Sequence, residues 1–194
     1  MFYNDVFLNY IKKLIKMTVL YISGSPRKNS NTDYLLNIAL SITGGYFLKL
    51  ADRELQPCKS CWGCLNTYRC IIEDDLSKEI IPLLLKCDGL VLGSPVYFNN
   101  VSAQLKMFID RTWSIKGKLR NKIGGAIVVG RKYGAESAIT AINAFFLKHE
   151  IIPANRGVNG IAFKLNEVED DLSAIEATKR LASRILELIK LIKE

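Results

Sequence analysis

The chain has 194 residues, of which 49% are apolar and 24% charged, values typical of one globular domain with a substantial core and not of a disordered chain. Its formal net charge of +8 is spread thinly along the sequence, which suits small anionic ligands such as phosphates better than a nucleic acid. No apolar run reaches the roughly 18 residues that a membrane-spanning helix needs.

The first segment, residues 1–17, is predicted to form a helical arm. Tyr3, Phe7 and Ile11 recur at helical spacing, and lysines follow them. We expect this arm to pack on the rest of the chain or on a second subunit. A helix lying on a membrane surface is a second possibility, and translation that starts at Met17 is a third.

From residue 18 onward, strand-like and helix-like segments alternate. Short apolar segments predict strands at 18–23, 46–50, 89–92, 124–129 and 158–163. Amphipathic segments predict helices at 31–43, 75–86, 101–112, 136–148 and 169–192. This alternation predicts an α/β domain over residues 18–194: a doubly wound, five-stranded parallel sheet of the flavodoxin-like type, with strand order 2-1-3-4-5.

In such a sheet, ligands bind at the carboxyl ends of the strands, near the point where the strand order reverses. The loop after the first predicted strand offers hydroxyls, an amide and a guanidinium ahead of a helix N-terminus, a combination that suits a phosphate monoester. The residues concerned are Ser25, Arg27, Ser30, Asn31 and Thr32. The P-loop and dinucleotide glycine patterns are both absent, which argues against an ATPase, a GTPase or a dinucleotide site.

Two further loops are expected at the same edge. After the third strand come Pro95, Val96, Tyr97, Phe98 and Asn99, which can cover a flat heterocycle. After the fourth strand, Gly130 and Gly134 permit close approach of the backbone. Each loop also has a plain structural explanation, as a capped helix start, a proline-containing turn or a solvated turn.

Four of the five cysteines fall on one loop after the second strand, at Cys58, Cys61, Cys64 and Cys70. The clustering and the lack of a signal peptide point to a cytoplasmic protein whose thiols bind metal or carry out redox chemistry. A compact Cx2Cx2C run with a fourth cysteine suits an iron–sulfur cluster, zinc also accepts four thiolates, and a dithiol switch would use only two. Cys87 lies apart and is expected to be a buried structural thiol.

Together, the segments GSPRKNSNT (24–32) and GSPVYFNNVSAQLKMFIDR (93–111) resemble the NAD(P)H-dependent FMN reductase group of flavodoxin-like proteins. The cysteine spacing resembles that of the iron–sulfur flavoproteins within this group. The resemblance implies FMN as a cofactor, with its phosphate on the first loop and its ring against the second. It also implies a [4Fe–4S] cluster on the four cysteines of loop 58–70, and a homo-oligomer.

The function expected from these residues and this resemblance is electron transport between a [4Fe–4S] cluster and FMN. The partners would be a small redox protein or another electron donor or acceptor, and no protein acid or base is required. A cluster-free NAD(P)H-dependent FMN or quinone reductase is the first alternative, and a zinc-stapled interaction module is the second. The single histidine, His149, is expected at the surface or at a helix end, without a metal or catalytic role.

Overall fold

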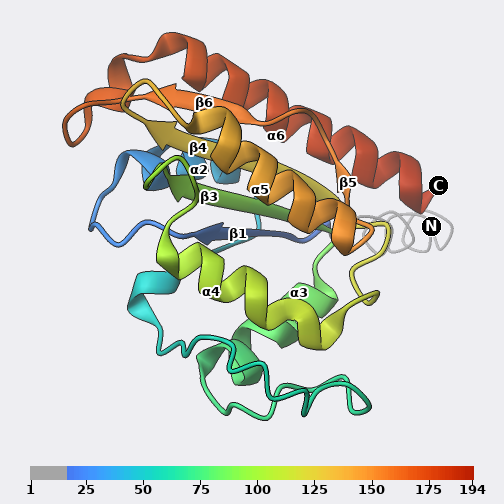
Figure 1. Ribbon diagram of the computed structural model, residues 1–194. Coiled ribbons are helices and arrows are strands. Elements are labelled where there is room, and N and C mark those ends of the chain that lie inside the picture. The colour runs from blue at the N-terminus through green and yellow to red at the C-terminus, as the bar shows by residue number, and fades with distance from the viewer. Residues whose placement is uncertain (1–16) are drawn as a thin grey trace, which may run out of the picture.

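The computed structural model describes residues 17–194, which form a parallel β-sheet with helices on both faces (Figure 1). The strands are β1 (Val19–Ser23), β2 (Tyr46–Lys49), β3 (Gly89–Pro95), β4 (Ile123–Gly130), β5 (Ile152–Pro153) and β6 (Val158–Ile161). The helices are α2 (Asn31–Thr43), α3 (Ile81–Lys86), α4 (Ala103–Arg111), α5 (Ala135–Lys148) and α6 (Leu172–Lys193). The predicted arm falls on residues 1–16 and lies outside the described residues.

The strand order is β2-β1-β3-β4, and two short strands share the position beside β4. β5 pairs with the start of β4, where Ile123 faces Ile152, and β6 pairs with its end, where Ile127 faces Val158. The predicted doubly wound flavodoxin-like class is confirmed. Residues 17–194 form six strands at the five predicted positions of the sheet, and β5 was not predicted because its two residues are too few to give an alternating pattern.

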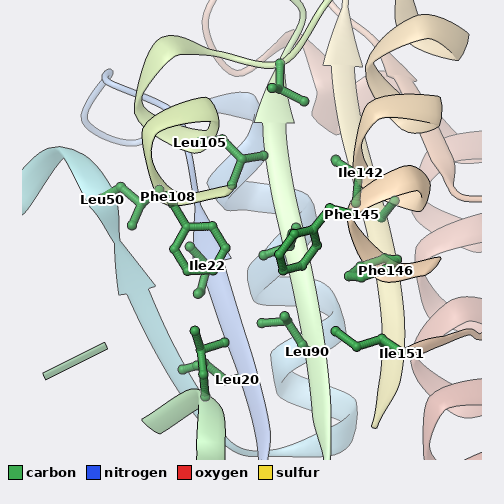
Figure 2. Packing of buried hydrophobic residues seen from close by; sticks show 14 of the residues in the cluster. Leu20, Ile22, Leu50, Leu90, Leu105, Phe108, Ile142, Phe145, Phe146 and Ile151 are labelled. Carbon is green, nitrogen blue, oxygen red and sulfur yellow. The ribbon is translucent and has the colours of Figure 1, made fainter. Parts of the chain in front are cut away.

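The apolar residues of the sheet point to both faces, as a parallel sheet covered on both sides requires. One cluster joins β1 and β3 to α3, α4 and α5, and it includes Phe108, Phe145 and Phe146 (Figure 2). The other cluster joins the sheet to α2 and α6 through residues such as Leu36 and Ile185. Within residues 17–194, no helix combines the length and apolar character that a membrane crossing needs.

Helix boundaries follow the predicted pattern where a polar cap is present. α2 spans the predicted residues 31–43, because Ser30 and Asp33 form a reciprocal capping box at its start. α6 begins at Leu172, later than predicted, because Asp171 is the cap and a 3-10 turn precedes it. The predicted helix 75–86 divides into a π-helical turn, Leu76–Ile80, followed by α3.

His149 lies at the C-terminal cap of α5, as predicted, but it is 3% exposed and therefore not a surface residue. The Thr112 hydroxyl donates to the carbonyl of Ile109 at 2.7 Å, so its oxygen accepts from the Nε2–H of His149 at 3.1 Å. The other ring nitrogen, Nδ1, is buried and has no hydrogen-bond partner among the described residues. Burial lowers the pKa of His149 from 6.5 to about 4.

Because His149 is buried and neutral, we expect part of the free energy of unfolding to be lost at acid pH. A neutral buried imidazole favours the native state above the unfolded pKa of 6.5, and that contribution is lost as the pH falls toward about 4. The loss should amount to about 3 kcal/mol in the free energy of unfolding. Urea unfolding between pH 7.5 and pH 4.5 should show a shallower decline in His149→Gln than in the wild type. If the free energy of unfolding declined equally with pH in both proteins, the lowered pKa of His149 would be contradicted.

Candidate functional site

A pocket of about 430 Å³ opens at the carboxyl edge of the sheet, where the loops after β1, β3, β4 and β6 converge. We call it the edge pocket. It is lined by Ser25, Arg27, Ser30, Asn31, Thr32, Pro95, Val96, Tyr97, Phe98, Val129, Gly130, Arg131, Ala162, Phe163, Lys164 and Leu165. Ten of the twelve residues predicted for FMN binding are therefore brought together, at the switch point between β1 and β3.

The first wall is the loop from Gly24 to Ser30, which is held against the sheet by its backbone. The Gly24 N–H donates to the carbonyl of Gly93 at 2.8 Å, and the Gly24 carbonyl accepts from the Ser102 hydroxyl at 2.6 Å. A Cβ at Gly24 would lie 2.7 Å from the Cβ of Leu105, so only glycine allows α4 to approach this closely. The loop then enters α2, and Ser30, Asn31 and Thr32 at the positive N-terminal end of this helix line the edge pocket.

A buried polar network fixes the shape of this loop from below. Asp33 accepts hydrogen bonds from the Ser23 hydroxyl, the Ser30 N–H and the Lys49 ammonium. Lys49 also donates to the Arg27 carbonyl, and the Lys49 side chain is only 9% exposed. A carboxylate at the centre and a lysine from the neighbouring strand thus hold the loop, and neither residue lines the pocket. The sequence pattern did not predict this pair.

The second wall is the segment after β3. The Val96 N–H donates to the Val129 carbonyl at 2.9 Å, and Tyr97 and Asn100 exchange two backbone hydrogen bonds. Phe98 is fully exposed and has a positive φ of 47°. Asn99, predicted for the same wall, lies outside the pocket.

Gly134 was also predicted for the pocket and also lies outside it. It starts α5 with a φ of 80°, and a Cβ there would be 2.4 Å from Oδ1 of Asn99. These two residues pack against each other beside the pocket. The arrangement gives Gly134 a packing role, since only glycine leaves room for Asn99.

A third wall comes from Ala162–Leu165, after β6, and sequence reasoning missed it. The Asn31 Nδ2 donates to the carbonyl of Lys164 at 2.7 Å and ties this wall to the start of α2. The Asn31 Oδ1 is buried without a partner among the described residues. The position of the segment, directly after a strand at the carboxyl edge, is the one signal that could have found it.

The donor set of the edge pocket fits a flavin monophosphate. Serine and threonine hydroxyls, the Arg27 guanidinium and the N-terminus of α2 surround one end, where a phosphate would find charge-assisted donors. Pro95, Val96 and Tyr97 form the apolar wall that a flat ring requires.

A second cavity, of about 420 Å³, lies beside the C-terminal end of α4, and we call it the cysteine cavity. It is lined by Cys58, Lys59, Ser60, Cys61, Trp62, Cys64, Cys70, Ile71, Ile72, Asp110, Arg111, Trp113 and Ser114. In the view of Figure 1, the segment that carries the cysteines lies below α4, on the side away from the sheet. Cys87 is buried outside this cavity, as predicted, and burial raises the pKa of its thiol to about 11.

All four loop cysteines face this one cavity, and Cys58 and Cys61 are exposed. Within residues 17–194, no three cysteine, histidine or acidic side chains converge tightly enough to hold a single metal ion. Four thiolates are a donor set that both an iron–sulfur cluster and a zinc ion accept.

The cysteine loop is joined to the fold by a buried ion pair that sequence reasoning did not predict. Arg111, the last residue of α4, binds Asp74 through two hydrogen bonds of 2.8 and 3.0 Å. Burial by itself would raise the pKa of Asp74, but hydrogen bonds from Arg111, Gln56 and Ser77 outweigh it and hold the pKa below its ordinary value. Asp74 therefore stays ionised, and it also accepts from the Ser77 N–H at 3.2 Å.

Sequence comparison identifies relatives over most of the chain. Residues 17–164 match the family described as NADPH-dependent FMN reductase. An iron–sulfur flavoprotein of Methanocaldococcus jannaschii is 40% identical over 194 residues, covering 92% of this chain and 100% of that protein. An iron–sulfur flavoprotein of Methanosarcina thermophila is 32% identical, covering 92% of this chain and 98% of that protein.

Solved structures agree on the fold. The Trp repressor binding protein of Bacillus subtilis superposes with a TM-score of 0.65 at 23% identity, covering 84% of this chain and 97% of that one. A flavodoxin from the Archaea has a TM-score of 0.61 at 13% identity, covering 90% of this chain and 99% of that one. At these identities the likeness concerns the arrangement of the sheet and helices.

Proposed function

The chain belongs to the iron–sulfur flavoproteins of the NADPH-dependent FMN reductase family, and on that premise we propose that it moves electrons between FMN in the edge pocket and a [4Fe–4S] cluster on the cysteine loop. The observation that carries the proposal is the presence of two separate cavities in one chain. One combines phosphate donors with an apolar wall, and the other is lined by all four loop cysteines.

When bound, FMN exchanges a hydride or single electrons, and an iron–sulfur cluster exchanges single electrons. The chain's own residues would hold these groups and limit their contact with water. Ser25, Arg27, Ser30, Asn31 and Thr32 would bind the phosphate, and Pro95, Val96, Tyr97 and Phe98 would lie against the ring. Cys58, Cys61, Cys64 and Cys70 would supply the thiolates. Trp62 and Trp113 would cover the cysteine cavity.

The partners in this proposal are an electron donor or acceptor, such as a small redox protein, and a second copy of this chain. Large apolar side chains are exposed at both cavities, among them Phe98 and Phe163 at the edge pocket and Trp62 and Ile71 at the cysteine cavity. Apolar residues gathered at a ligand site suit an interface that covers the ligand. Sedimentation of the wild type should therefore show an assembly larger than one chain.

A comparison of electron donors tests the proposed function. The anaerobic, FMN-loaded protein is mixed with either a reduced viologen dye, which gives one electron at a time, or NADPH. We expect the dye to reduce the FMN of the wild type faster than that of Cys61→Ala. NADPH should reduce the FMN of both proteins at the same rate. A cluster-free reductase, the rival that the family match favours, would show no difference between the two proteins with either donor.

Arg27 gives a prediction for the phosphate end of the edge pocket. Only FMN carries the phosphate, so Arg27→Ala should weaken FMN binding about tenfold and leave riboflavin binding unchanged, as expected for one charged hydrogen bond. Fluorescence titration with both ligands measures this. Lys28→Ala is the matched control, because Lys28 is the adjacent cation and does not line the pocket. Equal losses for FMN and riboflavin would remove Arg27 from the phosphate site.

A further inference from the structure

Arg111 is among the largest fully buried side chains of the described chain, and its side chain is 1% exposed. A buried guanidinium is costly unless its charge and its donors are all satisfied. Asp74 supplies the opposite charge, and its side chain is itself only 4% exposed. An apolar residue of similar size would avoid this cost, so the other contacts of Arg111 indicate its role.

Those contacts fall on the cysteine loop and on the residues that flank it. Nη1 donates to the carbonyl of Gln56 at 2.7 Å, and Nη2 donates to the carbonyl of Ile72 at 3.2 Å. Gln56 precedes the first loop cysteine and Ile72 follows the last, so one guanidinium joins both ends of the loop. Asp74 reinforces this closure, because it accepts from the Gln56 N–H at 3.0 Å.

The remaining donor of Arg111 reaches a cysteine directly. Nε donates to the Sγ of Cys70 at 3.2 Å. Together with the two bonds to Asp74 and the two to the loop carbonyls, this bond uses all five N–H donors of the guanidinium. Among the hydrogen bonds of the described residues, Cys70 is the one loop cysteine whose sulfur accepts such a bond.

We propose that Arg111 is the positioning residue of the cysteine site: it fixes both ends of the loop and holds the Cys70 sulfur in place by a charged hydrogen bond. The loop closure is independent of any bound group. The effect on a cluster rests on the proposed function, because hydrogen bonds to sulfur and nearby positive charge raise a cluster's reduction potential.

The test compares Arg111→Gln and Arg111→Lys with the wild type. In FMN-loaded, iron-free protein, amide hydrogen exchange at residues 56–72 should become about tenfold faster in both variants, as expected for the loss of a net hydrogen bond. In the iron-loaded protein, both should lose iron to a chelator about 10- to 100-fold more readily, the usual effect of removing a residue that supports a metal ligand. Arg111→Gln should also lower the midpoint potential of the cluster.

Lys116→Gln is the matched control. The Nζ of Lys116 lies 4.7 Å from the centroid of the Trp113 ring. The variant therefore removes a positive charge near the cysteine cavity but no hydrogen bond to the loop. In this variant the amide hydrogens of residues 56–72 should exchange, and iron should be released, at the wild-type rates. The proposal is overturned if Arg111→Gln behaves like the wild type, or if Lys116→Gln changes as much. It is also overturned if Arg111→Lys restores wild-type behaviour, because an ammonium has three donors and cannot make all five bonds.

Two outcomes require an additional experiment. If Arg111→Gln does not fold, hydrogen exchange is measured instead on the double variant Arg111→Gln/Asp74→Asn, in which the unpaired carboxylate is also removed. If the wild type holds no iron, the proposed function fails. Hydrogen exchange of the iron-free loop then still decides whether Arg111 positions it, with unchanged exchange in Arg111→Gln refuting that role.

Discussion

Replacing Cys58, Cys61, Cys64 or Cys70 singly with alanine is expected to abolish stable iron binding. A cubane held by four thiolates becomes labile at the iron that loses its ligand, so each variant should lose most of its iron and the broad thiolate-to-iron absorbance near ~400 nm. FMN should stay bound, because the edge pocket and the cysteine cavity share no lining residue. Iron assay and absorbance of anaerobically purified variants measure both effects.

Cys87→Ala is the matched control for this series. Cys87 is buried, its sulfur donates to the Leu84 carbonyl at 3.2 Å, and it does not line the cysteine cavity. The variant should therefore keep wild-type iron and wild-type FMN. If all four loop variants retained iron and transferred electrons normally, the cysteine loop would not hold the cluster.

Asp33→Ala is expected to destabilise the protein and to weaken FMN binding together. The change leaves the buried Lys49 without its counter-ion, and removing one partner of a buried ion pair costs about 3–5 kcal/mol. For a chain of this length, such a loss lowers the melting temperature by about 10 °C. The freed Ser23 and Ser30 groups should also loosen the first loop, which affinity for FMN would report.

The double variant Asp33→Ala/Lys49→Met separates the two effects. It removes both charges, so much of the lost melting temperature should return. FMN affinity should remain weak, because neither the carboxylate bonds to Ser23 and Ser30 nor the lysine bond to Arg27 is restored. A melting temperature of Asp33→Ala equal to that of the wild type would contradict the buried pair.

The fold could be predicted because its signals are local. The apolar run of β1 is readable over a few positions, and α2 was predicted at its observed bounds. β5 was missed because its two residues are too few to show the alternation of apolar and polar residues that marks a strand. The start of α6 was placed early because residues 167–170, three of which are acidic, form a 3-10 turn before the true cap.

The site was predicted where its residues lie in strand-ending loops, and it was missed where contacts join distant segments. Asn31 meets Lys164 across 133 positions, and no local pattern marks that pairing. Arg111 and Asp74 are 37 positions apart in the sequence. From the sequence alone, an arginine at the end of an amphipathic helix looks like an ordinary surface cation. Asn99 and Gly134, which were also predicted for FMN, do not line the edge pocket, and a Cβ at Gly134 would lie 2.4 Å from Oδ1 of Asn99.

Iron, acid-labile sulfide and FMN content per chain, measured together on anaerobically purified wild type, tests the central claim most directly. A chain with both groups bound should contain about four iron, about four sulfide and about one FMN. Zinc would appear as metal without sulfide, as expected for a structural thiolate site. FMN without iron or sulfide would contradict the proposed electron transfer between cluster and flavin, and it would identify the chain as a cluster-free flavin reductase.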